Sequence, residues 1–257
     1  MTHRLTAEIE TEHPYSRPLS GAKVRQLPSA LVPARTPLIG RTVALEPLDA
    51  ARHAGDLFEA SHGSEAALRI WDYLPWGPWN SEEEYTKFLR QQTARPDQIY
   101  YAVRLATGGK ACGQTSFLDI QPEHGVIEIG SIWFGLMLRR TRSATESIYL
   151  MLRYAMDDLG YRRMQWRCNA LNAASRAAAR RFGFRFEGIF HNHMIVKGRN
   201  RDTAWYSILD DEWPEVREIM ERWLASSNFD QAGTAKTSLT PLTGKRGPSR
   251  RGVISPK

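Results

Sequence analysis

Residues 139–183 read RRTRSATESIYLMLRYAMDDLGYRRMQWRCNALNAASRAAARRFG, and their pattern predicts a helix, a strand and a second helix. Ser143 is predicted to cap a helix, and Glu146, three residues later, to complete a capping box. Apolar side chains then recur every three or four residues as far as Leu159, which is typical of a helix with one buried face. Gly160 is predicted to end this helix in the left-handed conformation.

A strand and a second helix follow in the same stretch. Apolar and polar side chains alternate from Arg163 to Ala170, as they do in a strand. Asn172 is predicted to cap a helix from Ala173 to Phe182, and Gly183 to end it. With the hairpins expected upstream, between residues 99 and 138, this pattern predicts an α/β fold in which helices flank a mixed sheet.

Three arginines, Arg139, Arg140 and Arg142, stand at the start of the first helix. The backbone N–H groups of a helix N-terminus are unpaired and its dipole is positive there, so cations are unfavourable unless an anion is bound. The sequence therefore predicts an anion site, with phosphate as the simplest anion. Arginines that point into solvent are the alternative interpretation.

The order of these elements and several short motifs resemble the GNAT superfamily of acetyl-CoA-dependent N-acetyltransferases. The likeness is greatest to the RimJ/RimL-like branch, which acetylates the N-termini of ribosomal proteins. It covers residues 38–213, and its motifs are Glu128-Ile129-Gly130, Ala144-Thr145-Glu146, Asn172-x-x-Ser175 and Arg181-Phe182-Gly183-Phe184. The sequence departs from the family pattern at Arg140 and Arg142, where glycines are usual.

The resemblance implies a strongly bent, mostly antiparallel mixed sheet. In it one parallel pair, Val126–Leu138 and Arg163–Ala170, splays apart to admit acetyl-CoA. Backbone N–H groups from Arg140 to Ala144 would hold the pyrophosphate, and the backbone of Leu136–Leu138 would pair with the pantetheine amides. The full set of expected cofactor-binding residues is Leu136, Met137, Leu138, Arg139, Arg140, Thr141, Arg142, Ser143, Ala144 and Asn172.

Glu128 and Ser175 are the catalytic candidates. Glu128 lies within an apolar strand, where burial would raise the pKa of its carboxyl group and suit it to take a proton from an ammonium group. A structural ion pair and an anchor for the substrate amine are the alternatives. Many family members place a tyrosine in the second helix to protonate the leaving thiolate, and Ser175 is the nearest polar residue there. Cys168, on the apolar face of its strand, is predicted to belong to the core rather than to act as a nucleophile.

Two further features bear on the acceptor. The aromatic, proline-broken segment from Trp71 to Trp79 is either a packed lid or a wall of the acceptor pocket. His191 and His193 fall on one face of a predicted strand, but no third ligand lies at a suitable spacing. They therefore favour a wall of the substrate pocket over a metal site, and no metal is predicted.

The distribution of charge along the chain predicts where the domain begins and ends. The chain has 257 residues and a net charge of +7. Residues 1–37 carry five Lys/Arg against three Glu, and residues 227–257 carry six against one Asp, which leaves residues 38–226 neutral. We expect an N-terminal extension (1–37), an acetyltransferase domain (38–226) and a basic, disordered tail (227–257). Two cysteines form no disulfide framework, and the sequence shows neither a secretory signal nor a membrane-spanning run, so a cytoplasmic location is expected.

Three functions fit the sequence. The leading one is transfer of an acetyl group from acetyl-CoA to a primary amine by direct attack, without an acyl-enzyme. A catalytically silent acyl-CoA-binding or sensor protein of the same fold is the second. A nucleic-acid-binding protein is the third, and it is disfavoured because no helix-turn-helix or zinc pattern is present. The sequence leaves two classes of acceptor, a protein N-terminus and a small-molecule amine. It also allows a homodimer.

Overall fold

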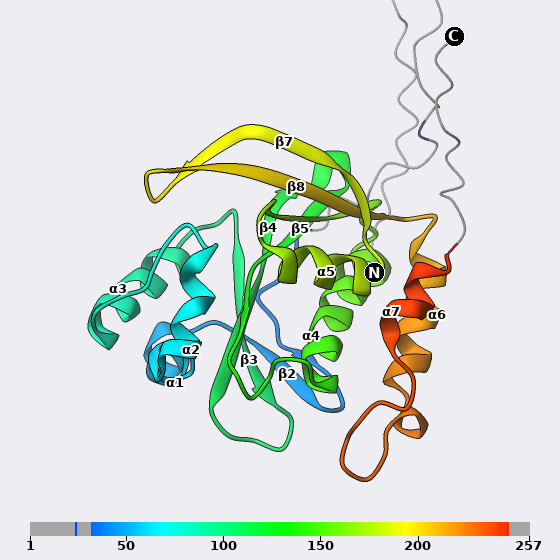
Figure 1. Ribbon diagram of the computed structural model, residues 1–257, viewed down its shortest axis with the longest axis horizontal. Helices are drawn as coiled ribbons and strands as arrows, with labels where there is room; N and C mark the ends of the chain where they lie inside the picture. Colours follow the sequence, from blue (N-terminus) through cyan, green and yellow to red (C-terminus); the bar gives the residue numbers. More distant parts are fainter. Residues whose placement is uncertain (1–23, 25–31, 247–257) are drawn as a thin grey trace, which may run out of the picture.

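The computed structural model describes Val24 and residues 32–246. Within these residues eight strands form one sheet in the order β1-β2-β3-β4-β5-β6-β8-β7 (Figure 1). The strands are β1 (Leu38–Ile39), β2 (Val43–Pro47), β3 (Ile99–Leu105), β4 (Ala111–Gln121), β5 (Val126–Phe134), β6 (Arg163–Asn169), β7 (Arg185–Val196) and β8 (Arg199–Leu209). The α-helices are α1 (Ala50–His62), α2 (Glu65–Leu68), α3 (Glu82–Thr93), α4 (Arg142–Arg153), α5 (Ala173–Arg181), α6 (Trp213–Leu224) and α7 (Leu239–Gly244).

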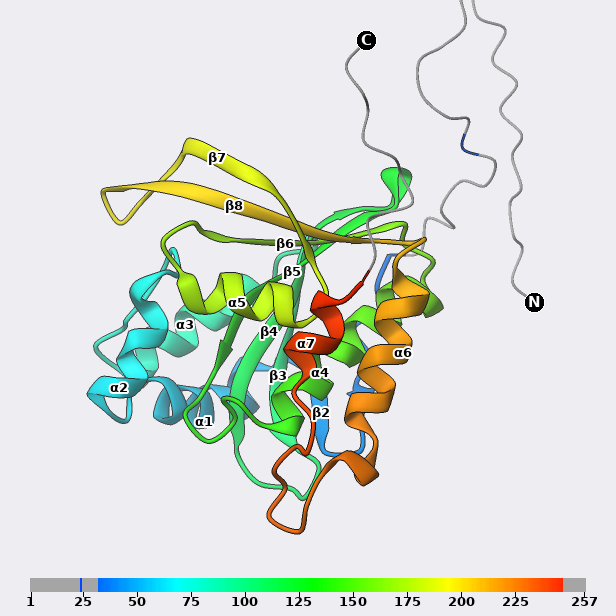
Figure 2. The ribbon, with the colours of Figure 1, turned by 45° about the vertical axis from the view of Figure 1, so that its right-hand side comes forward.

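Helices cover both faces of the sheet. Along β3, Tyr101 and Val103 point into a core shared with α4 and α6, and Tyr100 and Ala102 point into a second core shared with α1 and α3. Figures 1 and 2 show α1, α2 and α3 on one side of the strands and α4, α6 and α7 on the other. This two-sided burial gives the sheet the rigidity needed to hold a site at its centre.

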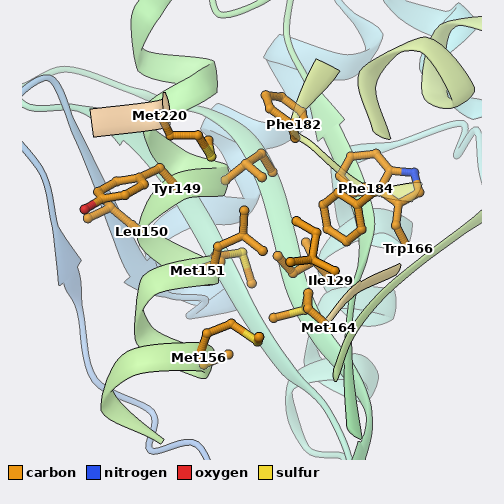
Figure 3. Close-up of a cluster of buried hydrophobic side chains, with 14 of the residues drawn as sticks. Ile129, Tyr149, Leu150, Met151, Met156, Met164, Trp166, Phe182, Phe184 and Met220 are labelled. Atoms are coloured by element: carbon orange, nitrogen blue, oxygen red, sulfur yellow. The ribbon is translucent and has the colours of Figure 1, made fainter. Parts of the chain in front are cut away.

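The larger core joins α4 to the middle of the sheet. Met151 of α4 and Met156, in the π-helical turn Tyr154–Asp158 that continues it, pack toward Ile129 and Met164 of the two parallel strands (Figure 3). All four side chains are at most 7% exposed. Burial of side chains of this size stabilises the folded state by about 1.5–3 kcal/mol each, so α4 is held firmly under the parallel pair.

The predicted splayed pair is confirmed. Strands β5 and β6 pair in parallel over three residues only, ending at Glu128 and Gln165, whereas the other strand pairs of the described sheet are antiparallel. Beyond Glu128 the register of β5 shifts at a bulge in which Ser131 has a φ of +51°. A bulge increases the local twist and bends the strand, so β5 turns away from β6 at this point.

The predicted extent of β5 is wrong at its end. The strand stops at Phe134, and Leu136 to Leu138 form a turn in which the N–H of Leu138 donates to the carbonyl of Gly135 at 3.0 Å. Leu136 and Met137 are exposed and Leu138 is fully buried. The apolar residues after Phe134 therefore reflect one buried residue of a turn, Leu138, and not a continuation of the strand over four more residues.

The predicted capping box at the start of α4 is also wrong. Thr141 is the N-cap, and its hydroxyl accepts from the N–H of Ala144 at 3.1 Å. Ser143 instead donates to the carbonyl of Thr42 at 3.3 Å. The carboxylate of Glu146 accepts the backbone N–H groups of Arg41 and Thr42 at 2.8 and 2.7 Å. A tertiary contact with the β1–β2 turn has replaced the local one.

The other predicted helix boundaries are confirmed. Gly160 and Gly183 are left-handed, with φ of +73° and +92°. Asn172 caps α5 by accepting the N–H of Ser175 at 2.9 Å.

The expectation of a disordered tail from residue 227 is wrong for residues 227–246. Phe229 packs edge-on against Trp223 at 5.2 Å between ring centroids, and the indole N–H of Trp223 donates to the carbonyl of Thr237 at 2.7 Å. Leu239 of α7 is 1% exposed, and the Arg246 side chain is 3% exposed. Few apolar residues are present here, but Phe229, Ala235, Leu239 and Leu242 all pack in or against the larger core. Residues 247–257 and most of the predicted extension 1–37 lie outside the described residues. No helix in the described part of the chain is long and apolar enough to cross a bilayer.

Candidate functional site

A cavity of about 1380 Å³ opens where β5 and β6 part. It is lined by Glu128–Phe134 of β5 and Trp166–Asn169 of β6, by the start of α4 and one face of α5, and by the segment Arg69–Trp76. The β7–β8 hairpin contributes a further wall, and Figures 1 and 2 show this hairpin reaching over the side of the molecule that carries α2 and α3. Because β6 diverges after Gln165, the following edge of β5 has no strand partner, and its backbone groups remain available to an extended ligand.

One end of the cavity is cationic. Four of the predicted cofactor residues line this end: Arg139, Arg140, Thr141 and Ala144. Asn172, the N-cap of α5, also lines the cavity. Arg140 is left-handed, with a φ of +64°, which accounts for the glycine that is usual at this position in the resembling family. Arg139 and Arg140, two of the arginines predicted to bind an anion, therefore lie in the turn before α4 and line the cavity there.

Several residues at the cationic end were not predicted from the sequence. Thr145, Arg180 and Arg181 line it, together with Ser238, Thr240 and Gly244 from the C-terminal segment. Arg181 donates to the hydroxyl of Thr145 at 3.0 Å, and burial lowers the pKa of its guanidinium. Arg181 was visible only as part of a motif, and the C-terminal residues gave no signal because their position depends on tertiary packing.

Five predicted cofactor residues lie away from the cavity lining: Leu136, Met137, Leu138, Arg142 and Ser143. The first three form the turn described above. Arg142 donates to the carbonyl of Leu224, and its guanidinium carbon lies 4.5 Å from the centroid of the Phe229 ring. Arg142 therefore ties the C-terminal segment to α4, and its prediction as a phosphate ligand is wrong in this structure.

Glu128 lines the cavity at the last paired residue of the parallel strands. It is 3% exposed, and burial raises the pKa of its carboxyl group, while the Arg167 guanidinium that binds it acts in the opposite direction. Arg167 also lies 3.6 Å from Asp119 and 4.8 Å from the centroid of the Trp205 ring. Glu128 is thus not the isolated carboxylate that its apolar neighbours predict, and the alternative of an ion pair is confirmed.

Ser175 borders the cavity from the first turn of α5. Its hydroxyl oxygen accepts from the indole N–H of Trp166 at 3.1 Å, and its side chain also hydrogen-bonds the thiol of Cys168. Cys168 is 6% exposed and also borders the cavity. Burial raises the pKa of its thiol, so the thiol stays protonated near neutral pH and is a poor nucleophile.

The aromatic segment packs over a core and also lines the cavity, and its role toward an acceptor stays a prediction. Trp71 is 2% exposed and packs against the rings of Trp79 and Trp133, as a lid over a core would. Tyr73 and Trp76 line the cavity. This segment is linked to the opposite wall, because the ammonium group of Lys197, at the tip of the β7–β8 hairpin, donates to the carbonyl of Trp71 at 2.7 Å.

The two histidines of β7 are separated by a bulge. Asn192 has a φ of +49°, and the strand register shifts around it. His193 lines the cavity and hydrogen-bonds Thr203 at 2.9 Å, whereas His191 is exposed and contacts Asp202 at 2.9 Å. The predicted pocket wall therefore includes His193 alone. Within residues 32–246 no group of three or more His, Cys, Asp or Glu side chains is arranged to hold a metal ion.

Comparison with known proteins places this geometry in a family. The family model described as an acetyltransferase (GNAT) domain matches residues 42–185, more than half of the chain. A crystal structure of a GCN5-related N-acetyltransferase from Brucella melitensis is 45% identical, has a TM-score of 0.80, and aligns over 82% of this chain and 96% of its own. YdaF of Bacillus subtilis strain 168, a candidate ribosomal N-acetyltransferase, is 27% identical over 66% of this chain and 90% of its own length.

A third relative shares the fold at lower identity. It is RimL, a ribosomal L7/L12 α-N-protein acetyltransferase whose structure holds coenzyme A, with 23% identity, a TM-score of 0.57, and coverage of 68% of this chain and 99% of its own. YdaF agrees with the likeness to the RimJ/RimL-like branch, and RimL shares the fold. With its family match, its splayed parallel pair and its cationic helix start, the chain belongs to the GNAT acetyltransferase family.

Proposed function

We propose that this acetyltransferase moves an acetyl group from acetyl-CoA to a primary amine by direct attack. GNAT acetyltransferases use acetyl-CoA, so the cofactor class follows from the family. One observation carries the rest: β5 loses its parallel partner after Glu128, and this leaves an open strand edge between a cationic helix start and a buried carboxylate.

The cofactor arm fits along that open edge. Backbone groups of Ile132–Phe134 are proposed to pair with the pantetheine amides, in place of Leu136–Leu138, because this part of β5 lines the cavity. The N–H groups of the first turn of α4, with Arg139 and Arg140, are proposed to hold the pyrophosphate. The thioester then lies toward Glu128, at the point where the strands part.

The proposed chemistry needs a base and an acid. The amine lone pair attacks the thioester carbonyl carbon, and the tetrahedral intermediate collapses as the C–S bond breaks. Glu128 takes the proton lost by the amine, directly or through one water, and the Ser175 hydroxyl donates a proton to the departing thiolate. Positioning supplies much of the rate, and general-base catalysis adds about 10²–10⁴-fold.

Thiol release from acetyl-CoA, measured against a panel of primary amines, tests this function. We expect amine-dependent release from the wild type, and in Glu128→Gln a fall in kcat of about 10²–10⁴-fold with little change in acetyl-CoA affinity. The isosteric amide keeps the volume of the carboxylate, so binding reports whether the cavity is intact. Equal turnover in the variant would remove Glu128 from the base role.

The silent acyl-CoA-binding alternative predicts binding of CoA without turnover against any amine in the panel. The nucleic-acid alternative predicts stabilisation by duplex DNA instead of CoA, and the neutral charge of residues 38–226 gives it no support. A cytoplasmic location and a homodimer stay predictions.

A further inference from the structure

The wall of the cavity that the β7–β8 hairpin contributes holds an arginine without a salt-bridge partner within residues 32–246. Arg201 pairs with Met194 across the β7–β8 hairpin and lines the cavity. The residue is half-buried. Its Nε is buried and has no hydrogen-bond partner among residues 32–246, and no carboxylate of those residues forms a salt bridge with its guanidinium. A buried N–H donor without a partner costs free energy, so an anion that accepts from this Nε would be stabilised.

The neighbouring charges do not fill this role. Glu128, the carboxylate whose charge acts on Arg201, is already bound by Arg167. Glu128, Cys168 and Arg167 are close enough to Arg201 to shift its pKa, although burial, which lowers that pKa, has the largest effect. Arg201 therefore lines the same cavity as the predicted base, with its Nε–H unpaired.

We propose that Arg201 binds a carboxylate carried by the acceptor, so that the preferred acceptors are primary amines with a carboxylate a few bonds from the nitrogen. This inference rests on the proposed function. It places the amine toward Glu128 and the carboxylate toward Arg201, which matches each substrate charge to a protein group of opposite sign. A single unpaired guanidinium offers two parallel N–H donors to a planar, singly charged group, which suits a carboxylate better than a phosphate dianion.

The test compares matched acceptors that differ only in this charge. One arm uses alanine and alaninamide, and the other uses Ala-Asp-Gly-amide and Ala-Asn-Gly-amide, so the arms distinguish an amino acid from a peptide N-terminus. The measured quantity is the ratio of kcat/KM for the acid to that for its amide, in wild type and in Arg201→Gln. Differences in amine pKa within a pair cancel when the two enzymes are compared.

We expect Arg201→Gln to lower this ratio about ten- to a hundred-fold in one arm, the effect of one charge-assisted hydrogen bond. Arg201→Lys, which keeps the charge without the fork, should give an intermediate ratio and also serves if the glutamine variant folds poorly. Arg199→Gln is the matched control, because Arg199 is exposed on the same strand outside the cavity lining, and it should leave the ratio unchanged.

Other outcomes overturn the inference. A ratio that stays constant in both arms would show that Arg201 does not bind a carboxylate. An equal loss of kcat for acid and amide would assign Arg201 to stabilisation of the tetrahedral oxyanion instead. Absence of turnover by the wild type with every amine would contradict the proposed function itself, and is thus distinguishable from failure of the inference alone.

Discussion

Arg142 shows how a charged residue at a helix start can act in stability rather than in ligand binding. Its guanidinium joins the carbonyl of Leu224 and the ring of Phe229, so Arg142→Ala removes one hydrogen bond and one cation–π contact. We expect a loss of about 1–2 kcal/mol in the free energy of unfolding, seen as a fall of a few degrees in Tm.

The KM for acetyl-CoA distinguishes a stabilising role of Arg142 from a role in cofactor binding. Arg142→Ala should leave it nearly unchanged, whereas Arg140→Ala, which alters a residue of the cavity lining, should raise it. A rise in KM for Arg142→Ala without a fall in Tm would show that Arg142 binds a phosphate group of the cofactor, as the sequence predicts.

The Glu128–Arg167 pair predicts the pH dependence of the reaction. Burial raises the pKa of Glu128 and Arg167 lowers it, so replacing Arg167 by glutamine should raise this pKa further. A base must be ionised to act, and activity is therefore lost as pH falls through its pKa. The acidic limb of the kcat/KM profile should move to higher pH in Arg167→Gln and stay near its original position in Arg167→Lys.

Two outcomes decide this pH prediction. Loss of the acidic limb in Glu128→Gln would assign the limb to Glu128. A limb that keeps its position in Arg167→Gln would show that another group titrates, because the ion pair could not then control the pKa of the base.

At the scale of elements, the C-terminal segment has the largest unexpected role. Residues 227–246 pack on α5 and α6 and place Ser238, Thr240 and Gly244 at the cationic end of the cavity. Truncation after residue 226 should remove buried contacts of Phe229 and Leu239, which contribute about 1.5–3 kcal/mol each when fully buried. We expect a lower Tm and weaker acetyl-CoA binding.

Truncation after residue 246 is the matched control for this prediction, since it keeps every described contact of the segment. It should leave Tm and acetyl-CoA affinity as in the full chain. If the shorter protein, ending at residue 226, matched the full chain in both measurements, the packing of α7 would contribute neither to stability nor to the site.

These elements also show what the sequence could predict. Local signals worked where the partner lies within four residues: Asn172 caps its own helix, and Gly160 and Gly183 end theirs. They failed where a distant group competes, as when Glu146 binds the β1–β2 turn instead of its own helix start. The splay after Glu128 was predictable by resemblance, whereas the partner of Glu128 was not, because Arg167 looked like any polar residue on an alternating strand.

At the scale of the whole molecule, the cavity lies between two groups of elements. Strand β5 and the start of α4 form one wall, and β6, α5 and the C-terminal segment form the other, while β5 and β6 share only three residue pairs. A ligand that contacts both walls binds the folded state alone, so its binding free energy adds to the stability of the whole fold.

CoA should therefore raise the Tm of the full chain. At a concentration one hundred times its Kd, bound CoA stabilises the fold by about 2.7 kcal/mol, and a scan of concentration should follow this mass-action dependence. Dephospho-CoA should give a smaller shift if Arg180 or Arg181 contacts the 3′-phosphate, and added salt should reduce the difference between the two ligands by screening exposed charges. Duplex DNA at the same charge concentration is the control for simple attraction to the basic ends of the chain. A Tm that does not respond to millimolar CoA would contradict both the acetyltransferase proposal and the silent-binding alternative, because each requires the folded state to bind this cofactor.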